Sequence, residues 1–165
     1  MEWKEYQKAA SRTLARTGSK MNNNLHMTLG IITELTEYTV ARDNNDVSNE
    51  KEELGDLYWY VANWFTINKF EGKAIPGSLS MPILIGDLCD MYKKELAYNK
   101  KANSDRCYGI MCNILYRLHN ACIKNEYSIQ DILQTNIDKL KVRYPEKFTT
   151  EKALNRDLSA EAKVL

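Results

Sequence analysis

The fold is decided by residues 29–65, LGIITELTEYTVARDNNDVSNEKEELGDLYWYVANWF. Apolar residues recur in this stretch at intervals of three and four, which is the pattern of helices with one buried face. The run AspAsnAsnAsp at 43–46 prefers turns and divides the stretch into two helices. Glu34 and Glu37 share one face of the first helix, and Glu53 and Asp56 share one face of the second, because residues three apart point the same way. The short connection favours antiparallel packing, which can bring the two acidic pairs together.

Four converging carboxylates repel one another in a partly buried groove unless protons or divalent cations neutralise them. Ligand sets made only of oxygen favour Mg²⁺ over zinc, with Mn²⁺ as a substitute. The alternative is that these acids are solvated surface charges. Apolar residues flank both pairs, however, and an apolar setting favours a metal site over an exposed acidic face. We therefore expect Glu34, Glu37, Glu53 and Asp56 to bind a divalent cation.

The rest of the chain continues the helical pattern, since only three prolines and seven glycines interrupt its 165 residues. We predict an all-α fold with helices at about 3–15, 25–41, 48–68, 79–98, 105–124 and 128–144, and a short helix and tail at 149–165. One domain is expected over 1–148, built from a hairpin at about 24–69, a second hairpin at about 79–125 and a C-terminal helix at about 128–144.

Composition narrows the range of partners and environments. The 23 Lys and Arg residues nearly balance the 22 Asp and Glu residues, so no global field favours nucleic acid or a membrane surface. The chain lacks a signal-peptide pattern and a long apolar run, so a cytoplasmic protein is expected. We expect reduced, buried thiols at the four cysteines and packing roles for the two histidines, at positions Cys89, Cys107, Cys112, Cys122, His26 and His119.

Three segments resemble the MazG-type all-α nucleoside triphosphate pyrophosphohydrolases. The central one is GluLeuThrGlu at 34–37, a spacer of fifteen residues, and GluLeuGlyAsp at 53–56. TrpLysGluTyrGlnLysAlaAlaSerArgThr at 3–13 is similar to the start of phage and bacterial relatives, and AsnIleAspLysLeuLysValArgTyrProGluLysPhe at 136–148 is similar to their ending. The resemblance covers well over half the chain. Thr33 and Thr36 stand where relatives often carry glycine.

The resemblance implies an antiparallel helix bundle and a Mg²⁺-dependent enzyme that cleaves an NTP or dNTP between its α and β phosphates. Nucleoside monophosphate and pyrophosphate would be the products. The four acids would be catalytic as well as metal-binding, with Glu37 as our choice of general base. Substrate-binding residues are expected at Asn136, Lys139, Arg143, Arg42, Asn24, Tyr60 and Trp64.

Each of these substrate-binding assignments has a structural alternative. The polar side chains on the last helix can form a solvated face, with Arg143 contacting Glu146. Tyr60 and Trp64 can be core residues instead of stacking on a base. Asn24 can cap a helix instead of reaching the nucleotide from a loop expected at 22–24.

The second hairpin can be aligned with the first as a degenerate repeat. AspLeuCysAsp at 87–90 then matches GluLeuThrGlu, and CysTyrGlyIle at 107–110 matches GluLeuGlyAsp. Cys107 and Ile110 replace two of the four ligands, so we expect this half to be a supporting one, as in the dimeric dUTPase branch of the superfamily. The alternative is that any two amphipathic hairpins can be aligned in this way.

Three functional alternatives stay open. The enzyme can be restricted to dUTP, or it can act on another pyrophosphate bond such as that of phosphoribosyl-ATP. A non-catalytic helical module that binds a nucleotide alarmone or a partner helix is the third. A homodimer or higher homo-oligomer is expected because the C-terminal helix retains apolar surface to cover.

Overall fold

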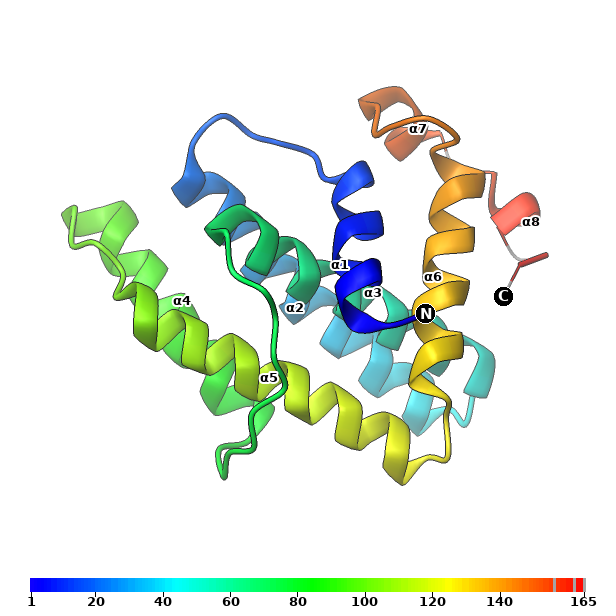
Figure 1. Cartoon of the computed structure of the whole chain (residues 1–165), viewed down its shortest axis with the longest axis horizontal. Coiled ribbons are helices and arrows are strands. Elements are labelled where there is room, and N and C mark those ends of the chain that lie inside the picture. Colours follow the sequence, from blue (N-terminus) through cyan, green and yellow to red (C-terminus); the bar gives the residue numbers. More distant parts are fainter. Residues whose placement is uncertain (156, 162, 165) are drawn as a thin grey trace.

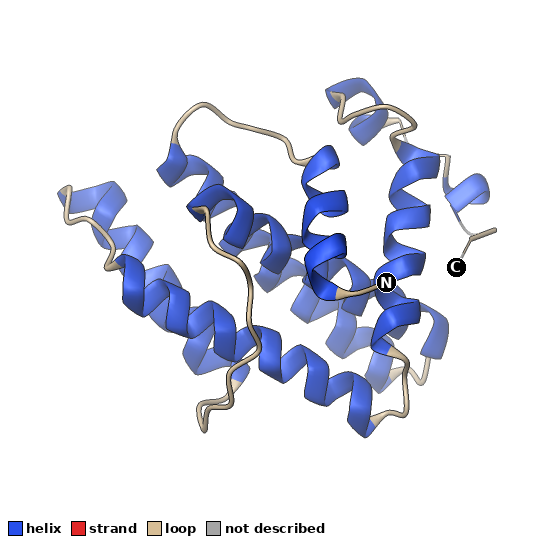
Figure 2. Ribbon diagram, in the orientation of Figure 1, coloured by secondary structure: helices blue, strands red, loops and turns tan. Residues whose placement is uncertain are grey.

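In the computed structural model, which describes residues 1–155, 157–161 and 163–164, the chain is a bundle of α-helices (Figure 1). The described residues contain no strand, which confirms the predicted all-α class (Figure 2). A 3₁₀ turn at Ser11–Thr13 follows the first helix. The α-helices are α1 (Trp3–Ala10), α2 (Lys20–Asp43), α3 (Val47–Asn68), α4 (Met81–Tyr98), α5 (Ser104–Lys124), α6 (Ile129–Arg143), α7 (Thr150–Leu154) and α8 (Leu158–Glu161).

Helix α3 lies at the centre of the bundle. It packs along α2, and it also contacts α5, α1 and α6. Helices α4 and α5 pack on each other and on α2 and α3 respectively, so the two hairpins form four helices around one core. Helices α1 and α6 lie on the other side of α3 (Figure 1). Because of this arrangement, α3 contributes to both the core and the acidic site.

The composition of α3 explains its central place. Leu54, Leu57, Tyr58, Val61 and Phe65 lie on one face of the helix and are fully buried, and Ala62 and Trp64, which flank that face on either side, are buried too. A helix that is apolar around much of its circumference must be covered by several neighbours. Its tryptophan at position 64 also lies in the core, where Nε1 donates a hydrogen bond of 2.7 Å to the hydroxyl of Tyr92 on α4. That bond satisfies the indole N–H and links the two hairpins.

Two sequence-based boundaries were wrong near the N-terminus. Helix α2 begins at Lys20 rather than about Leu25, because the side chain of Ser19 caps it by accepting a hydrogen bond from the backbone of Asn22. The predicted loop at 22–24 therefore lies within the first turn and a half of a helix. The first helix ends at Ala10 and gives way to the 3₁₀ turn, short of the predicted end near Ala15.

Several other helix starts have a side-chain cap. Asp46, Asn103 and Ser128 each accept a backbone N–H from three residues ahead, and they begin α3, α5 and α6. All four cysteines are free, and Cys107, Cys112 and Cys122 are buried, while Cys89 is half-buried. Across the described residues, none of the helices has both the length and the apolar character needed to cross a membrane.

Two glycines provide a matched test of this packing. Gly30 of α2 lies against Tyr60 of α3, so an added Cβ would overlap the tyrosine ring, whereas Gly109 of α5 has no atom within 4 Å of such a Cβ. We expect Gly30→Ala to lower the free energy of unfolding by about 1–3 kcal/mol through overpacking. Gly109→Ala should raise it by about 0.5–1 kcal/mol through helix propensity. Urea unfolding of both variants checks the contrast, and equal effects would contradict the α2–α3 contact.

Candidate active site

A cavity of about 470 Å³ opens beside the acidic residues. Helix α2 supplies Glu34 and Glu37 to its lining, and α3 supplies Glu53 and Asp56. The opposite wall comes from the end of α6 and the residues after it, including Phe148 and Ala153. This volume lies within the range of small-molecule sites, which is about 300–1,000 Å³. All four predicted acids therefore line one cavity of ligand size.

Three of the four carboxylates converge. One oxygen from each of Glu34, Glu37 and Glu53 lies within 4.8 Å of the others. Glu37 is exposed, Glu34 is half-buried and Glu53 is only 6% exposed. The cluster thus begins at solvent and ends inside the protein, with its innermost acid on the central helix.

Burial and mutual repulsion hold protons on this cluster. Burial raises the pKa of Glu53 to about 9, and the hydrogen bond with Glu34 and the nearby charges of Asp56, Glu34 and Glu37 add to the effect. Burial likewise raises the pKa of Glu34, as does repulsion from Asp56. Glu53 therefore keeps its proton at neutral pH and donates it towards Glu34.

A divalent cation could replace those protons. The donor set is three carboxylates at short mutual distances, which suits a hard cation with oxygen ligands. A positive charge at this place would favour the ionised carboxylates and so lower the pKa of Glu53 from its raised value. The residues present therefore fit Mg²⁺ or Mn²⁺.

The fourth acid, Asp56, is held by α6. Its Oδ1 accepts a hydrogen bond of 2.7 Å from Nδ2 of Asn136, and its Oδ2 accepts one of 2.6 Å from Nζ of Lys139. Asn136 in turn accepts a bond of 2.8 Å from the hydroxyl of Tyr6 on α1. Residues that hydrogen-bond a ligand's carboxylate fix its orientation. Asp56 is thus positioned by two neighbouring helices.

Lys139 is fully buried, an unusual place for an ammonium group. Its Nζ also lies 3.1 Å from Oε1 of Glu52, which gives it two carboxylate partners. Burial alone would lower the pKa of Lys139, but the charges of Asp56 and Glu52 outweigh that effect and raise it. Lys139 is therefore a permanent cation between two acids of α3.

Asn136 and Lys139 were predicted to contact the substrate. The structure instead directs both side chains at Asp56, beneath the cavity lining, with 3% and 0% of their surface exposed. The sequence located them correctly on the same helix but could not give the direction of their side chains. Their contacts indicate that they position Asp56.

Aromatic residues form another wall of the cavity. The rings of Trp59 and Tyr60 meet edge to face, with centroids 4.9 Å apart, and the ring of His26 meets Tyr60 edge to face at 6.0 Å. Tyr60 was predicted as a substrate-stacking residue, and it does line the cavity. Nδ1 of His26 is buried and has no hydrogen-bond partner. This wall therefore places aromatic rings next to the acids.

Arg143 also lines the cavity, as a predicted phosphate-binding residue should. Its guanidinium forms a two-bond ion pair with the carboxylate of Glu161 on α8, and both groups are largely buried. The expected alternative was a surface contact with Glu146, but the partner lies farther along the tail. Arg143 would have to share or release Glu161 in order to bind a substrate anion.

Three predicted substrate residues lie outside this cavity. Asn24 is on α2 and exchanges hydrogen bonds with Asn68, so the prediction that it lies in a loop is wrong. Trp64 is a core residue, which was the structural alternative to stacking on a base. Arg42 is exposed and pairs with its neighbour Asp43.

Several cavity residues had no place in the predicted site. Trp59 follows Asp56 by three residues on the same helical face, so its spacing is a signal that could have identified it. Glu52 lies four residues before Asp56, so helical spacing also places it on that face. Tyr6 and Phe148 reach the site through tertiary packing, and local spacing contains no signal for them.

The second hairpin does not repeat the acidic cluster. Asp87 pairs with Arg106 at 2.8 Å, and Asp90 pairs with Lys93 and Lys94. In the proposed alignment Asp87 matches Glu34 and Cys107 matches Glu53. The partner of Asp87 is Arg106, one residue before the aligned position. Gly109, which was aligned with the buried Gly55, lies in open space, so the two glycines have different packing roles.

No family model matches the chain, and no curated protein or solved structure matches it either.

The pKa of Glu53 predicts how stability depends on pH. In the unfolded chain this glutamate loses its proton near its ordinary value of 4.5, but in the folded protein it keeps the proton until about pH 9. The folded state then binds more protons in this window, so stability falls as pH rises from about 4.5 to 9.

Glu53→Gln is neutral at every pH and should flatten this dependence, making the variant more stable than the parent protein at pH 8. Urea unfolding between pH 5 and pH 9 in a chelator is the measurement, within the window set by the ordinary pKa of 4.5 and the raised pKa of about 9. Glu5→Gln, at an exposed position on α1, is the control and should leave the slope unchanged. Parallel curves for Glu53→Gln and the parent would show that Glu53 titrates normally.

Proposed function

We propose that the protein is a Mg²⁺-dependent nucleotide pyrophosphohydrolase of the MazG type, which hydrolyses an NTP or dNTP to a nucleoside monophosphate and pyrophosphate. The observation that carries the proposal is the convergence of Glu34, Glu37 and Glu53 in a cavity that Asp56 also lines. Such a cluster suits divalent cations, and these are the usual partners of nucleotide phosphates. The spacing of the E-x-x-E and E-x-x-D motifs supports the same proposal.

In this proposal Glu34, Glu37, Glu53 and Asp56 hold the cation. When bound, Mg²⁺ neutralises phosphate oxygens and makes the α phosphorus a better electrophile. Water attacks that phosphorus, the bond to the bridging oxygen breaks, and pyrophosphate leaves. Glu37, the exposed member of the cluster, accepts the proton of the water.

The remaining cavity residues suit the other parts of a nucleotide. Arg143, at the end of α6, supplies a guanidinium to the cavity. This planar cation can form two hydrogen bonds with the oxygens of one phosphate group. Tyr60 and Trp59 provide a face for the base. Lys139 and Asn136 keep Asp56 in place without contacting the substrate.

Two related readings use the same acids. A hydrolase restricted to dUTP, or one acting on phosphoribosyl-ATP, would differ in the walls of the cavity and not in its carboxylates. A non-catalytic module that binds an alarmone would have no need of a clustered set of acids whose repulsion must be neutralised. We therefore place hydrolysis ahead of binding alone.

A screen of common NTPs and dNTPs with Mg²⁺, read out as pyrophosphate release, tests the proposal. We expect at least one nucleotide to be cleaved, and Glu53→Gln to lower kcat by about a hundredfold or more because it removes a cation ligand. The variant should stay folded, since Gln has the shape of the protonated Glu53 and can still donate a hydrogen bond to Glu34. Glu5→Gln should retain full activity.

The pattern of products separates the alternatives. Release from dUTP alone identifies the restricted enzyme. No release from any nucleotide by a folded protein that still binds a nucleotide with Mg²⁺ identifies the binding module. Undiminished activity in Glu53→Gln would contradict the acidic site itself.

We also propose a homodimer, but not through the C-terminal helix expected from the sequence, because Ile132, Leu133, Ile137 and Leu140 of α6 are buried within the chain. Leu29, Ile32 and Val40 are exposed along α2, at 51%, 36% and 54% of their surface, and Val47 at the start of α3 is 50% exposed. Apolar side chains spaced along one helix face favour a second copy as cover. Light scattering after size exclusion should give twice the chain mass, and Leu29→Lys with Val40→Lys should give the monomer. A monomeric parent protein would contradict this proposal.

A further inference from the structure

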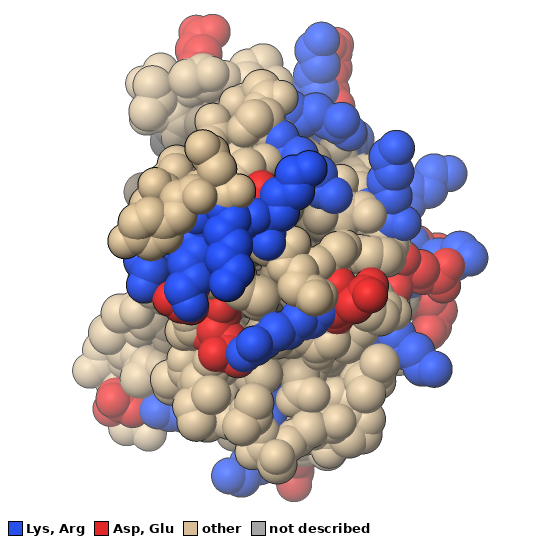
Figure 3. Space-filling view, turned by 90° about the vertical axis from the view of Figure 1, so that its left-hand side faces the viewer, with Lys and Arg blue, Asp and Glu red and all other residues tan. Residues whose placement is uncertain are grey.

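A second hollow lies at the junction of α4 and α5, away from the acidic cavity. It has a volume of about 250 Å³ and is lined by Lys94, Lys100, Lys101 and Arg106 together with only two acids, Asp87 and Asp90. Lys and Arg side chains gather on this side of the molecule (Figure 3). The lining therefore has a surplus of two positive charges.

The two hairpins place opposite charges at corresponding contacts. In the first hairpin Glu34 contacts Glu53, nineteen residues later, so two acids meet and share a proton that a cation could replace. In the second, Asp87 contacts Arg106, also nineteen residues later, so the cation belongs to the protein. Lys94 neutralises Asp90 in the same way. A hollow whose acids are already paired has no requirement for a metal ion.

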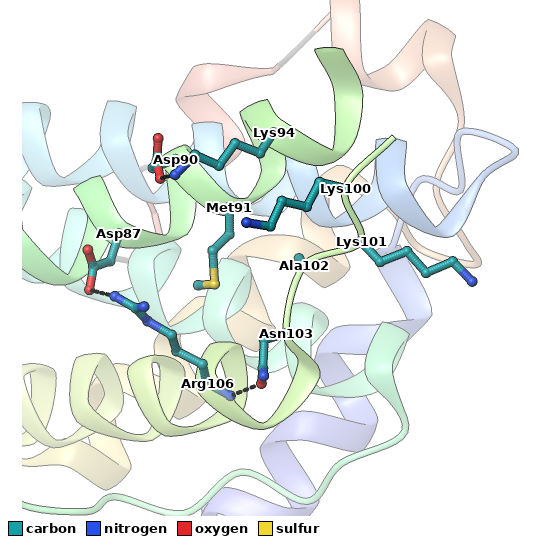
Figure 4. A pocket seen from close by; sticks show the side chains of 9 residues that line it. All are labelled: Asp87, Asp90, Met91, Lys94, Lys100, Lys101, Ala102, Asn103 and Arg106. Carbon is teal, nitrogen blue, oxygen red and sulfur yellow. Dashed lines mark hydrogen bonds and ion pairs between the residues drawn. The ribbon is translucent and has the colours of Figure 1, made fainter. Parts of the chain in front are cut away.

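The remaining positive charge is directed into the hollow. Figure 4 shows the side chain of Lys100 extending towards Met91 and Arg106, whereas Lys101 extends away from them. Among the described residues, no acid forms an ion pair with Lys100. The ammonium of Lys100 and the guanidinium of Arg106 thus face the same space from the loop and from α5.

The loop that carries Lys100 is fixed on both sides. The backbone N–H of Lys100 donates to the carbonyl of Lys94 at 3.2 Å, and that of Ala102 donates to the carboxylate of Glu95 at 3.0 Å. Asn103 then caps α5 by accepting the N–H of Arg106 at 2.9 Å. A lysine on an anchored backbone loses less freedom when it binds a ligand than one on a mobile loop.

We propose that this hollow binds a phosphate-bearing anion directly, without a metal ion, through Lys100 and Arg106 with Lys94 beside them. Ammonium and guanidinium groups form strong charge-assisted hydrogen bonds with phosphate oxygens. A linear oligophosphate matches a small hollow with several separate cations. The site is independent of the activity proposed for the acidic cavity.

Calorimetric titration of the full chain with inorganic tripolyphosphate tests the site. A chelator in the buffer removes divalent cations, so the acidic cavity stays negative and repels the probe. We expect binding to the parent protein, a loss of about tenfold or more in affinity for Lys100→Glu, and a change of less than about threefold for Lys101→Glu. The two variants change the net charge equally and differ only in the direction of the side chain.

A third variant tests the site by a gain. Asp87→Asn removes the partner of Arg106, so it should tighten the binding of tripolyphosphate several-fold. Thermal melting followed by circular dichroism verifies that each variant is folded, and Lys100→Gln replaces Lys100→Glu if the latter unfolds.

Several results would overturn the proposal. These are no binding to the parent protein, equal losses for Lys100→Glu and Lys101→Glu, or weaker binding by Asp87→Asn. Binding of a short single-stranded DNA that tripolyphosphate cannot displace would assign the surface to nucleic acid instead. Unaltered tripolyphosphate binding by an NTP-inactive protein would still support the site, so failure of the enzymatic proposal is distinguishable from failure of this one.

Discussion

The buried ammonium of Lys139 is the interaction on which the candidate site depends. A charge without solvent needs partners, and this one has carboxylates from Asp56 and Glu52 on α3. Because Lys139 is on α6, the requirement fixes α6 against the central helix. Asn136 extends the same network to Tyr6 on α1. Three helices thus meet around one hydrogen-bonded acid, and the cavity lies where α2 completes the arrangement.

The acidic cluster brings like charges together instead of opposite ones. Glu34, Glu37 and Glu53 are brought together by α2 and α3 despite their repulsion, and burial together with that repulsion raises the pKa of Glu53. The apolar core of α3 supplies the packing that tolerates it. The charge of Lys139 is neutralised within the protein by Glu52 and Asp56. The carboxylates around Glu53 are neutralised by protons or by a cation taken from solution. In the second hairpin, Arg106 neutralises the corresponding acid, Asp87, within the protein.

Local pattern was enough for the fold class, the acidic pairs and most helix starts. Periodicity at three and four follows from helix geometry, and Asp46, Asn103 and Ser128 satisfy backbone donors as their residue types suggest. The directions of Lys139 and Trp64 could not be read in this way, because each depends on which helix packs beside its own. The asparagines at 22–24 favoured a loop, but the cap at Ser19 and tertiary packing overrode their weak helix propensity. The tail residues at the cavity wall depend wholly on long-range contact.

One such contact joins the two ends of the chain. The guanidinium of Arg12 donates to the carbonyls of Tyr144 and Glu146, at 2.6 and 2.7 Å, across a separation of 132 to 134 residues. Closing so long a loop costs more conformational entropy than closing a hairpin, so this contact forms more slowly than the hairpins do. The α2–α3 hairpin also precedes α6 in the chain, so during synthesis it leaves the ribosome before the residues that close its cavity. In that order of synthesis, Glu34, Glu37 and Glu53 are complete before the residues of α6 and the tail that wall their cavity.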